Sequence, residues 1–263
     1  MLRDTWTKTL WDQRRTLIGW AIGFAVVSII YGGFYPFAAT PEYEELISSL
    51  PAGLADAFGW DDIASPHGYL GSTVYGILGP VLAIVMAIGL GSRAIAGSEE
   101  DGSLELLVTH PTSRTSIVLQ KALALAIALA GGGVVVFLAI MAIRGPIDLD
   151  LGWTRIGAAS VSLALMGMLF GAVAILTGAI TGRKGTTVGV TAGVAVFAFL
   201  ANGLAPQVDA IAWMQKISPF YWANGTATLR DGFDPLFTLL LAGASALALA
   251  AAVVAFNRRD IGV

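Results

Sequence analysis

The chain contains no cysteine and little charge, and both absences limit what it can be. Among its 263 residues are 15 Lys and Arg, 18 Asp and Glu, and no Cys. Without thiols the chain can form neither a disulfide nor a thiolate metal site. Charged residues make up 13% of the sequence, whereas a typical soluble domain carries about 25%. The net charge of -3 argues against a nucleic-acid partner.

Charge is missing altogether from six long apolar windows. A membrane-crossing helix needs roughly 20 apolar residues, and each window is long enough for one such helix but too short for two. A charged residue at the centre of a span costs about 2.5–3.5 kcal/mol, so we predict an all-α polytopic membrane protein with six transmembrane helices and the lipid bilayer as its surroundings. The windows are 16–41, 63–92, 122–143, 156–182, 185–208 and 235–257. Within a single transmembrane domain, 1–263, we place spans at about 17–37, 69–91, 122–143, 155–181, 186–204 and 235–256.

The distribution of Lys and Arg orients these spans. Six spans put both termini on the same side of the membrane, and basic residues accumulate in cytoplasmic loops. With both termini in the cytoplasm, 11 of the 15 basic residues fall on the cytoplasmic side. We therefore predict cytoplasmic termini and an acidic outside loop at 39–68. Charges every few residues before the first span, with no small-residue cleavage site after it, predict no removable signal peptide.

Two further segments have amphipathic or aromatic character. Residues 1–16 carry Trp6 and Trp11 close to one helical face, with basic residues elsewhere, which predicts a helix lying in the cytoplasmic interface. Residues 205–234 are rich in aromatic side chains, which are typical of the headgroup level of a membrane. We expect an outside amphipathic or re-entrant segment there, before the last span.

The polar run between the second and third spans keeps a helical periodicity of its own. Leu104 and Leu107 lie three residues apart and share a helical face. An acidic run at 99–101 favours a helix N-terminus, and Pro111 ends the pattern. We predict a short amphipathic helix over about 97–111 on the cytoplasmic face; the alternative is a solvated loop that merely joins two spans.

The residue patterns of common catalytic sites are missing. No Ser/His/Asp set or metal-ligand spacing is visible. The run G-A-I-T-G-R-K-G-T at Gly178–Thr186 has the wrong spacing for a phosphate-binding loop, and no strand precedes it. The sequence therefore predicts no catalytic, cofactor-binding or metal-binding residue in this chain, so any ATP would be handled by another chain.

Few polar residues remain inside the spans. Ion-coupled transporters usually keep a charged residue there, and the six windows hold none, so proton coupling is disfavoured. An apolar pathway suggests a lipophilic substrate. The remaining polar residues are candidates for a substrate pathway, with ordinary helix packing as the alternative: Tyr31, Thr73, Tyr75, Thr177 and Asn202.

The residues 96–107, A-G-S-E-E-D-G-S-L-E-L-L, followed by Pro111, Arg114 and Lys121, resemble a family signature. The signature is that of the membrane permease subunits of ATP-binding-cassette transporters of the type-2 exporter class. It typically shows an acidic run, Gly-Thr-Leu-Glu, two leucines, Pro-x-Ser/Thr-Arg and a Lys. Segments near both ends, 11–20 and 256–260, are similar to this family too.

Two positions depart mildly from the signature. Ser103 stands in place of the usual Thr, and Ser98 stands where an acid is common. The resemblance covers the whole chain, and the cytoplasmic run is its specific part.

The resemblance implies a six-span half-transporter in a prokaryotic plasma membrane. Two permeases, either two copies or a copy and a paralogue, would join two ATPase subunits that bind ATP and Mg. The helix at 97–111 would be the coupling helix that docks on the ATPase. On this basis ATPase coupling is assigned to Glu99, Glu100, Asp101, Leu104, Glu105, Leu107, Pro111 and Arg114.

The expected function is ATP-driven export of a lipophilic substrate, such as a drug, a peptide or a lipid. One alternative is a non-transporting subunit that transmits ATPase motion to an extracytoplasmic partner. A membrane-embedded enzyme would need clustered polar residues, and an ATP-independent channel would need a polar stripe along its pore. Neither feature is visible in the sequence.

Overall fold

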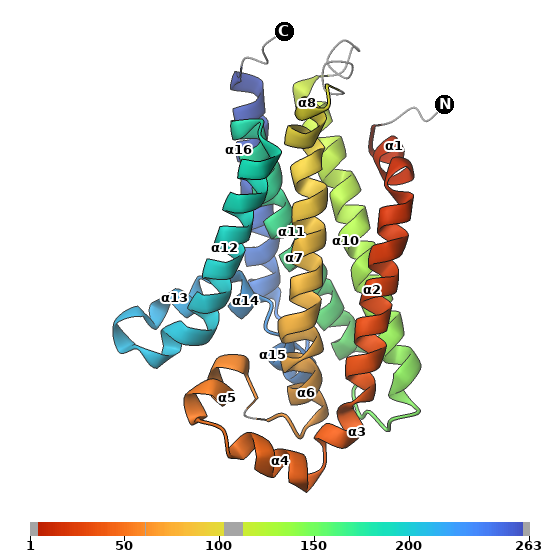
Figure 1. Cartoon of the computed structure of the whole chain (residues 1–263), viewed down its shortest axis with the longest axis vertical. Helices are drawn as coiled ribbons and strands as arrows, with labels where there is room; N and C mark the ends of the chain where they lie inside the picture. The colour runs from red at the N-terminus through yellow and green to blue at the C-terminus, as the bar shows by residue number, and fades with distance from the viewer. Residues whose placement is uncertain (1–4, 61, 103–112, 260–263) are drawn as a thin grey trace.

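The computed structural model describes residues 5–60, 62–102 and 113–259, and these form an elongated bundle of helices (Figure 1). No strand occurs in this described part of the chain, and six of its helical segments are long and apolar enough to cross a membrane. The prediction of an all-α polytopic membrane protein is therefore confirmed.

Some of the membrane-crossing segments are single helices and others are several helices joined end to end. The first is α2 (Arg14–Gly33) with α3 (Tyr35–Ala38). The second joins α6 (Pro66–Ser72), the π-helix η1 (Val74–Leu78), α7 (Gly79–Ser92), the π-helix η2 (Arg93–Gly97) and α8 (Ser98–Glu100). The others are α10 (Arg114–Arg144), α11 (Trp153–Thr181), α12 (Lys184–Leu204) with η3 (Ala205–Gln207), and α16 (Pro235–Arg258).

The two ends of the bundle differ in what they carry (Figure 1). Both termini, α1 (Thr5–Asp12) and α8 lie at one end, which we call the terminal face. The opposite end, which we call the loop face, carries α4 (Pro41–Ser48) and α5 (Ala52–Phe58). Between α12 and α16 the chain forms η4 (Asp209–Ile211), α13 (Trp213–Lys216), α14 (Pro219–Trp222) and α15 (Gly225–Asp231).

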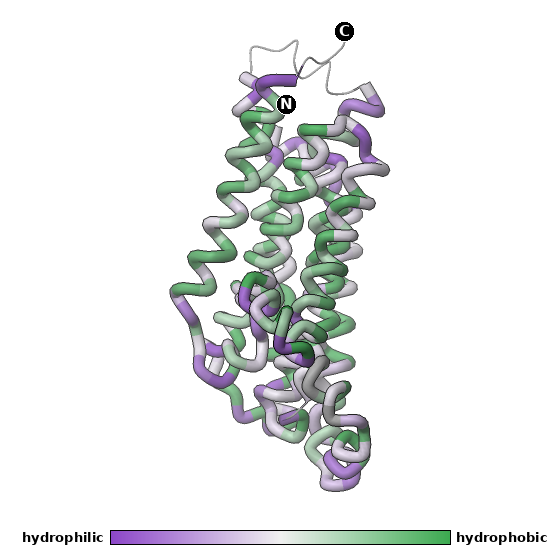
Figure 2. Tube along the Cα trace, turned by 90° about the vertical axis from the view of Figure 1, so that its left-hand side faces the viewer, coloured by the Kyte–Doolittle hydropathy of each residue, from purple (hydrophilic) through white to green (hydrophobic). Residues whose placement is uncertain are grey.

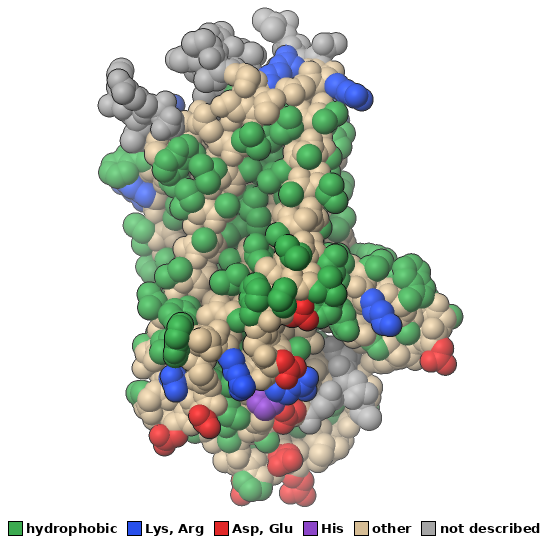
Figure 3. Space-filling view, turned by 180° about the vertical axis from the view of Figure 1, so that it is seen from behind, with side chains coloured by type: hydrophobic (Ala, Val, Ile, Leu, Met, Phe, Trp, Pro, Cys, Tyr) green, Lys and Arg blue, Asp and Glu red, His purple; other side chains and the backbone are tan. Residues whose placement is uncertain are grey.

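The bundle has the surface of a protein that sits in a bilayer. Hydrophobic residues run along the long helices, and charged side chains gather towards the two ends (Figures 2 and 3). α2 alone exposes Ile18, Ile22, Val26 and Ile29. Such a surface is stable against lipid but not against water, because exposed apolar area costs free energy only in water.

Helix α11 lies at the centre of the bundle, where it packs against α7, α10, α12 and α16. Its side chains Met166, Phe170 and Ile175 are fully buried. Small residues let its neighbours approach closely: a Cβ on Gly91 of α7 would lie 2.9 Å from the Gly171 carbonyl oxygen. The missing side chain of Gly91 therefore allows α7 to lie close to α11, whereas the missing side chain of Gly171 makes room for Leu125 of α10.

The second span is broken near its loop end. Pro80 has no N–H to donate to the Gly76 carbonyl, and its ring crowds that carbonyl. The helix widens just before it: the Leu78 N–H donates to the Thr73 carbonyl at 3.0 Å, a five-residue step. The structure accommodates Pro80 with a π-helix at Val74–Leu78.

The segment at 1–16 forms α1 from Thr5 onward. Its first N–H donates to the Gln120 side chain of α10 at 2.7 Å, so α1 is tied to the start of the third span at the terminal face. Its position in the membrane interface stays a prediction.

Two glycines of α10, Gly131 and Gly133, offer a test of the packing between α10 and α11. A Cβ on Gly133 would lie 2.8 Å from the Ser160 carbonyl oxygen of α11, whereas a Cβ on Gly131 meets nothing within 4 Å. We expect Gly133→Ala to lower stability by about 1–3 kcal/mol through overpacking. Gly131→Ala should be neutral or stabilising, since Ala is the better helix former. Thermal unfolding of both purified variants measures this; equal melting temperatures would contradict the packing described.

Candidate functional site

A group of polar contacts joins four helix ends at the terminal face. We call it the terminal cluster, made of Glu99, Glu100, Arg114, Lys184 and Arg259. Arg259 at the end of α16 forms an ion pair with Glu99 of α8, in which Nη1 lies 3.0 Å from Oε2 and Nη2 contacts Oε1. Both side chains are about three-quarters buried, at 24% and 23% exposed. A bidentate pair of this kind fixes orientation as well as distance.

Arg114 fastens the same end of α16 from the side of α10. Its Nη1 donates to the backbone carbonyls of Phe256 at 3.3 Å and Arg259 at 2.7 Å. The last carbonyls of a helix have no partner within it, and an arginine both satisfies them and complements the negative end of the helix dipole. Arg114 therefore holds α16 against α10.

Glu100 performs the corresponding role at the start of α12. Its Oε1 accepts a hydrogen bond from the Lys184 N–H at 2.8 Å. This N–H is one of the unpaired donors at a helix N-terminus, where negative charge is also favoured. The preceding turn is Gly182, with φ +62°, and a Cβ there would collide with the Arg259 guanidinium. The turn between α11 and α12 is thus fitted to the Glu99–Arg259 pair.

The terminal cluster contains three of the residues predicted to couple to an ATPase, Glu99, Glu100 and Arg114. Asp101 is exposed at the end of α8. Leu104, Glu105, Leu107 and Pro111 lie outside the described residues, together with most of the predicted helix at 97–111. The segment at 256–260 is similar to the family in sequence, but that similarity assigns no role to Arg259. Only the folded structure shows that Arg259 contacts Glu99.

A cavity of about 380 Å³ lies towards the loop face, and we call it the chamber. Its walls come from the broken second span, from α11 and α12, and from the short helices after α12. Many of the lining side chains are polar, although the surrounding spans are apolar. The lining includes Phe58, Asp62, Ser72, Tyr75, Gly76, Ile77, Pro80, Met166, Phe199, Asn202, Gln215, Phe220, Asn224, Thr226 and Arg230.

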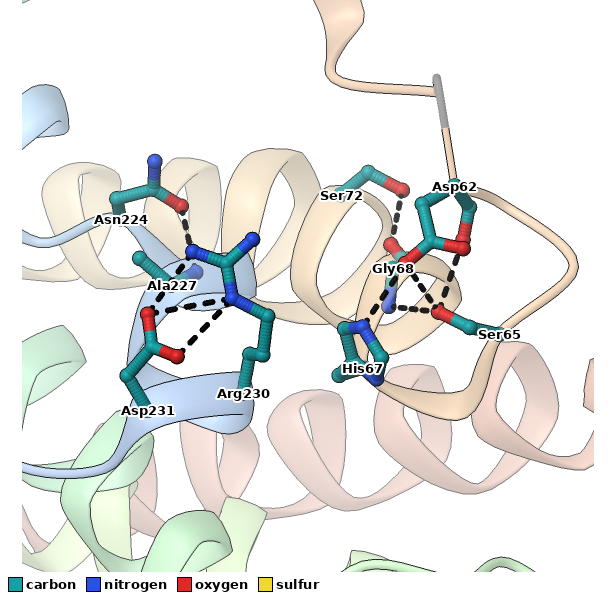
Figure 4. A network of polar contacts seen from close by, with 9 residues as sticks. All are labelled: Asp62, Ser65, His67, Gly68, Ser72, Asn224, Ala227, Arg230 and Asp231. Atoms are coloured by element: carbon teal, nitrogen blue, oxygen red, sulfur yellow. Dashed lines mark hydrogen bonds and ion pairs between the residues drawn. The ribbon is translucent and has the colours of Figure 1, made fainter.

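Close backbone contacts hold the wall of the chamber together. A Cβ on Gly71 of α6 would collide with the backbone of Thr226, and a Cβ on Gly225 would lie 2.5 Å from the Tyr75 Cβ. Asn224 caps α15 by accepting from the Ala227 N–H at 3.2 Å (Figure 4). Helix α15 is therefore seated directly against α6 and η1.

Two hydrogen-bonded pairs that each include a carboxylate lie beside the chamber, and Figure 4 shows their contacts. Asp62 accepts from His67 Nε2 at 2.8 Å and from Ser65 Oγ at 2.7 Å. Arg230 donates to both carboxylate oxygens of Asp231, and these hydrogen bonds lower the pKa of Asp231. Both carboxylates at the rim are therefore held by hydrogen bonds, and Arg230 also neutralises Asp231.

An apolar cluster packs beside the chamber. It includes Ile84, Ile88, Phe170 and Leu241, all buried, and Met166 belongs both to it and to the chamber wall. The apolar core between α7, α11, α12 and α16 is therefore continuous with the chamber wall at Met166.

Two of the five predicted pathway residues meet in the chamber. Tyr75 and Asn202 both line it, and the Tyr75 hydroxyl is bonded to Ser160 Oγ at 2.9 Å. Thr73 and Thr177 instead donate to carbonyls of their own helices, and Tyr31 is exposed on α2. These three do not belong to the chamber lining.

No group of three His, Asp or Glu side chains able to hold a metal is found among the residues that the structure describes.

The profile of the family described as ABC-2 family transporter protein matches residues 7–261. The chain belongs to this family. The resemblance stated from the cytoplasmic signature is therefore confirmed, and the match spans all six membrane segments. ABC-2 proteins are the membrane components of ATP-binding-cassette transporters, so the chain is a permease subunit and the family implies an ATPase partner. No curated protein matched the chain.

Substitution of Arg259 tests the terminal cluster of this ABC-2 permease. We expect Arg259→Gln to destabilise the contact between α8 and α16 by about 1.5–3 kcal/mol, the usual value for hydrogen bonds to charged groups. Faster backbone hydrogen exchange in residues 96–102 would report the loss. The neighbouring Arg258 is exposed, so Arg258→Gln is the matched control and should leave exchange unchanged. If both variants exchange alike, the ion pair does not stabilise this face.

Proposed function

We propose that this ABC-2 protein is the permease half of an ATP-driven exporter and that a separate ATPase docks at its terminal face. The terminal cluster is the observation that carries the proposal. It links the ends of α8 and α10, which flank the predicted coupling segment, to α12 and α16. A displacement of that segment would therefore reach four membrane helices at once.

The export direction rests on the orientation predicted from Lys and Arg. With the terminal face in the cytoplasm, the chamber lies on the outer side, beside the apolar cluster around Phe170. A polar cavity on the outer side suits the release of substrate outwards. The expected substrate class is a lipophilic drug, peptide or lipid.

A second permease, either another copy or a paralogue, would complete the transporter. The outward face of α12 supports this part of the proposal. Gly185, Gly189 and Gly193 recur every four residues there, and a Cβ on any of them meets nothing within 4 Å. Val194 and Phe197 of the same helix are also exposed. Small residues at this spacing allow two membrane helices to approach closely.

The alternative is a non-transporting subunit that passes ATPase motion to an extracytoplasmic partner. It would use the same terminal cluster, but it gives no role to the chamber. Transport is therefore the better-supported function.

Charge reversal at the coupling segment tests ATPase docking. We expect Asp101→Lys with Glu105→Lys to reduce copurification of the co-expressed ATPase at least about tenfold, because like charge at an interface costs several kcal/mol. The control reverses two acids of α4 at the loop face, Glu42→Lys with Glu44→Lys, and should not alter copurification. Retained ATPase with the first variant, in correctly folded protein, would overturn the docking proposal.

A further inference from the structure

A groove of about 740 Å³ runs along the surface of the bundle between α10 and α11. Small residues leave the space for it: Ala130 and Gly133 of α10 and Gly157 of α11 belong to its lining. Val134 and Val161 also line the groove and are about half exposed. The groove therefore opens to the surroundings of the bundle. It lies away from the face of α12, because α10 and α12 are on opposite sides of α11 (Figure 1).

The walls of the groove are apolar along its length. Among the described lining residues, the only hydroxyl groups are those of Thr154, at the loop-face end of α11, and Ser160. The Ser160 hydroxyl is already engaged, since it bonds the Ile156 carbonyl and the Tyr75 hydroxyl, both at 2.9 Å. Such walls suit a hydrocarbon chain, whereas the N–H and C=O groups of a peptide would stay unpaired there, which is costly in a membrane.

The length of the groove corresponds to one leaflet of a bilayer. Its lining runs along α10 from Ala126 to Phe137 and along α11 from Trp153 to Met168, which is about 16 Å and about 22 Å of helix. One leaflet contributes about 15 Å of hydrocarbon. Trp153 is 63% exposed at the loop-face end of α11, and exposed Trp is typical of the membrane interface. The groove therefore extends from the interface at the loop face into the bilayer.

The α10 wall of the groove leads to a basic residue. Arg144 is the last residue of α10 and follows Phe137 by seven positions. Seven residues make about two helical turns, so Arg144 shares the face that lines the groove. Among the residues that the structure describes, Arg144 forms no ion pair, although Asp148 and Asp150 follow it in the connection to α11.

The α11 wall begins beside a second basic residue. Arg155 is exposed in the first turn of α11, next to Thr154 of the lining. It too lacks an ion pair within the described part of the chain. Hydrogen bonds from Arg230 lower the pKa of Asp231 most, and the more distant charge of Arg155 adds to this. Two guanidinium groups therefore remain available at the interface end of the groove, and guanidinium matches the geometry of a phosphate.

We propose that this groove binds an anionic phospholipid, with an acyl chain along the small residues of α10 and α11 and the phosphate at Arg144 and Arg155. A diacylglycerol would offer the same chains without the charge, and a second copy of the permease would offer a helix without a phosphate. No described residue lines both this groove and the chamber. The lipid site is therefore separate from the site of the proposed transport function.

The absence of cysteine from the chain allows a label to be placed at one point in the groove. Ala130→Cys puts a thiol on the lining, and Gly131→Cys puts one at the same depth of α10 but outside the lining, where a Cβ meets nothing within 4 Å. Each full-length variant is labelled with a bimane fluorophore in phosphatidylcholine nanodiscs. A small fraction of phosphatidylglycerol or of diacylglycerol, each with brominated acyl chains, is then included. Bromine quenches a nearby fluorophore, so quenching reports the local concentration of that lipid.

Brominated phosphatidylglycerol should quench the label at position 130 as if it were enriched about tenfold over the bilayer average, as expected for one charge-assisted contact. The label at position 131 should report the bilayer average, and brominated diacylglycerol should quench both labels alike. Arg144→Gln in the Ala130→Cys chain should remove most of the enrichment. The matched control is Lys216→Gln, at an exposed lysine of α13 outside the groove, which should leave the enrichment unchanged.

Several outcomes would overturn the inference. Equal quenching of the two labels by phosphatidylglycerol would mean that the groove retains no lipid, as expected if a second copy covers it. Enrichment of diacylglycerol to the same extent would show that the phosphate is not recognised. Enrichment that survives both Arg144→Gln and Arg155→Gln would contradict the position of the headgroup. These results are independent of ATPase copurification, so the inference can fail while the proposed permease function stands.

Discussion

A membrane-embedded backbone has no water to bond with, and this constraint governs where the protein can depart from regular helix. Each unpaired N–H or C=O in the hydrocarbon region costs several kcal/mol. Most of the long helices remain regular across the membrane, as the unbroken α10 and α11 do. The second span is not a regular α-helix between Thr73 and Pro80, and this irregular stretch lines the chamber. The break and the polar cavity are therefore two aspects of one feature.

The two ends of the molecule satisfy the unpaired backbone groups of their helix ends in different ways. At the terminal face, helix ends are satisfied by charged side chains from other helices: Arg114 bonds the last carbonyls of α16, and Glu100 bonds the first N–H of α12. At the loop face, short helices cap themselves, as Asn224 does for α15. Contacts between helices couple their movements, whereas local caps do not. The contacts at the terminal face therefore couple the ends of four membrane segments.

The sequence predicts the six spans well because a membrane penalises charge so strongly that the charge-free windows are unambiguous. The charge-free windows contain few polar residues, so Tyr75 and Asn202 could be identified from the sequence as candidates for a substrate pathway. The remaining walls of the chamber could not be predicted, because Gln215, Asn224 and Thr226 reach it only when the chain after α12 folds back. That return depends on Gly71 and Gly225 meeting across about 150 residues of sequence. The pairing of Glu99 with Arg259 is equally non-local.

Amide hydrogen exchange of the full chain in nanodiscs tests the link between the broken span and the chamber most directly. If the chamber is hydrated, amides of η1 should exchange at least about tenfold faster than those of α7 at 84–92, which lie in the same span beside the apolar cluster. Equal protection of the two segments would mean that water does not reach the break. It would contradict the account in which this polar cavity is the working part of the permease.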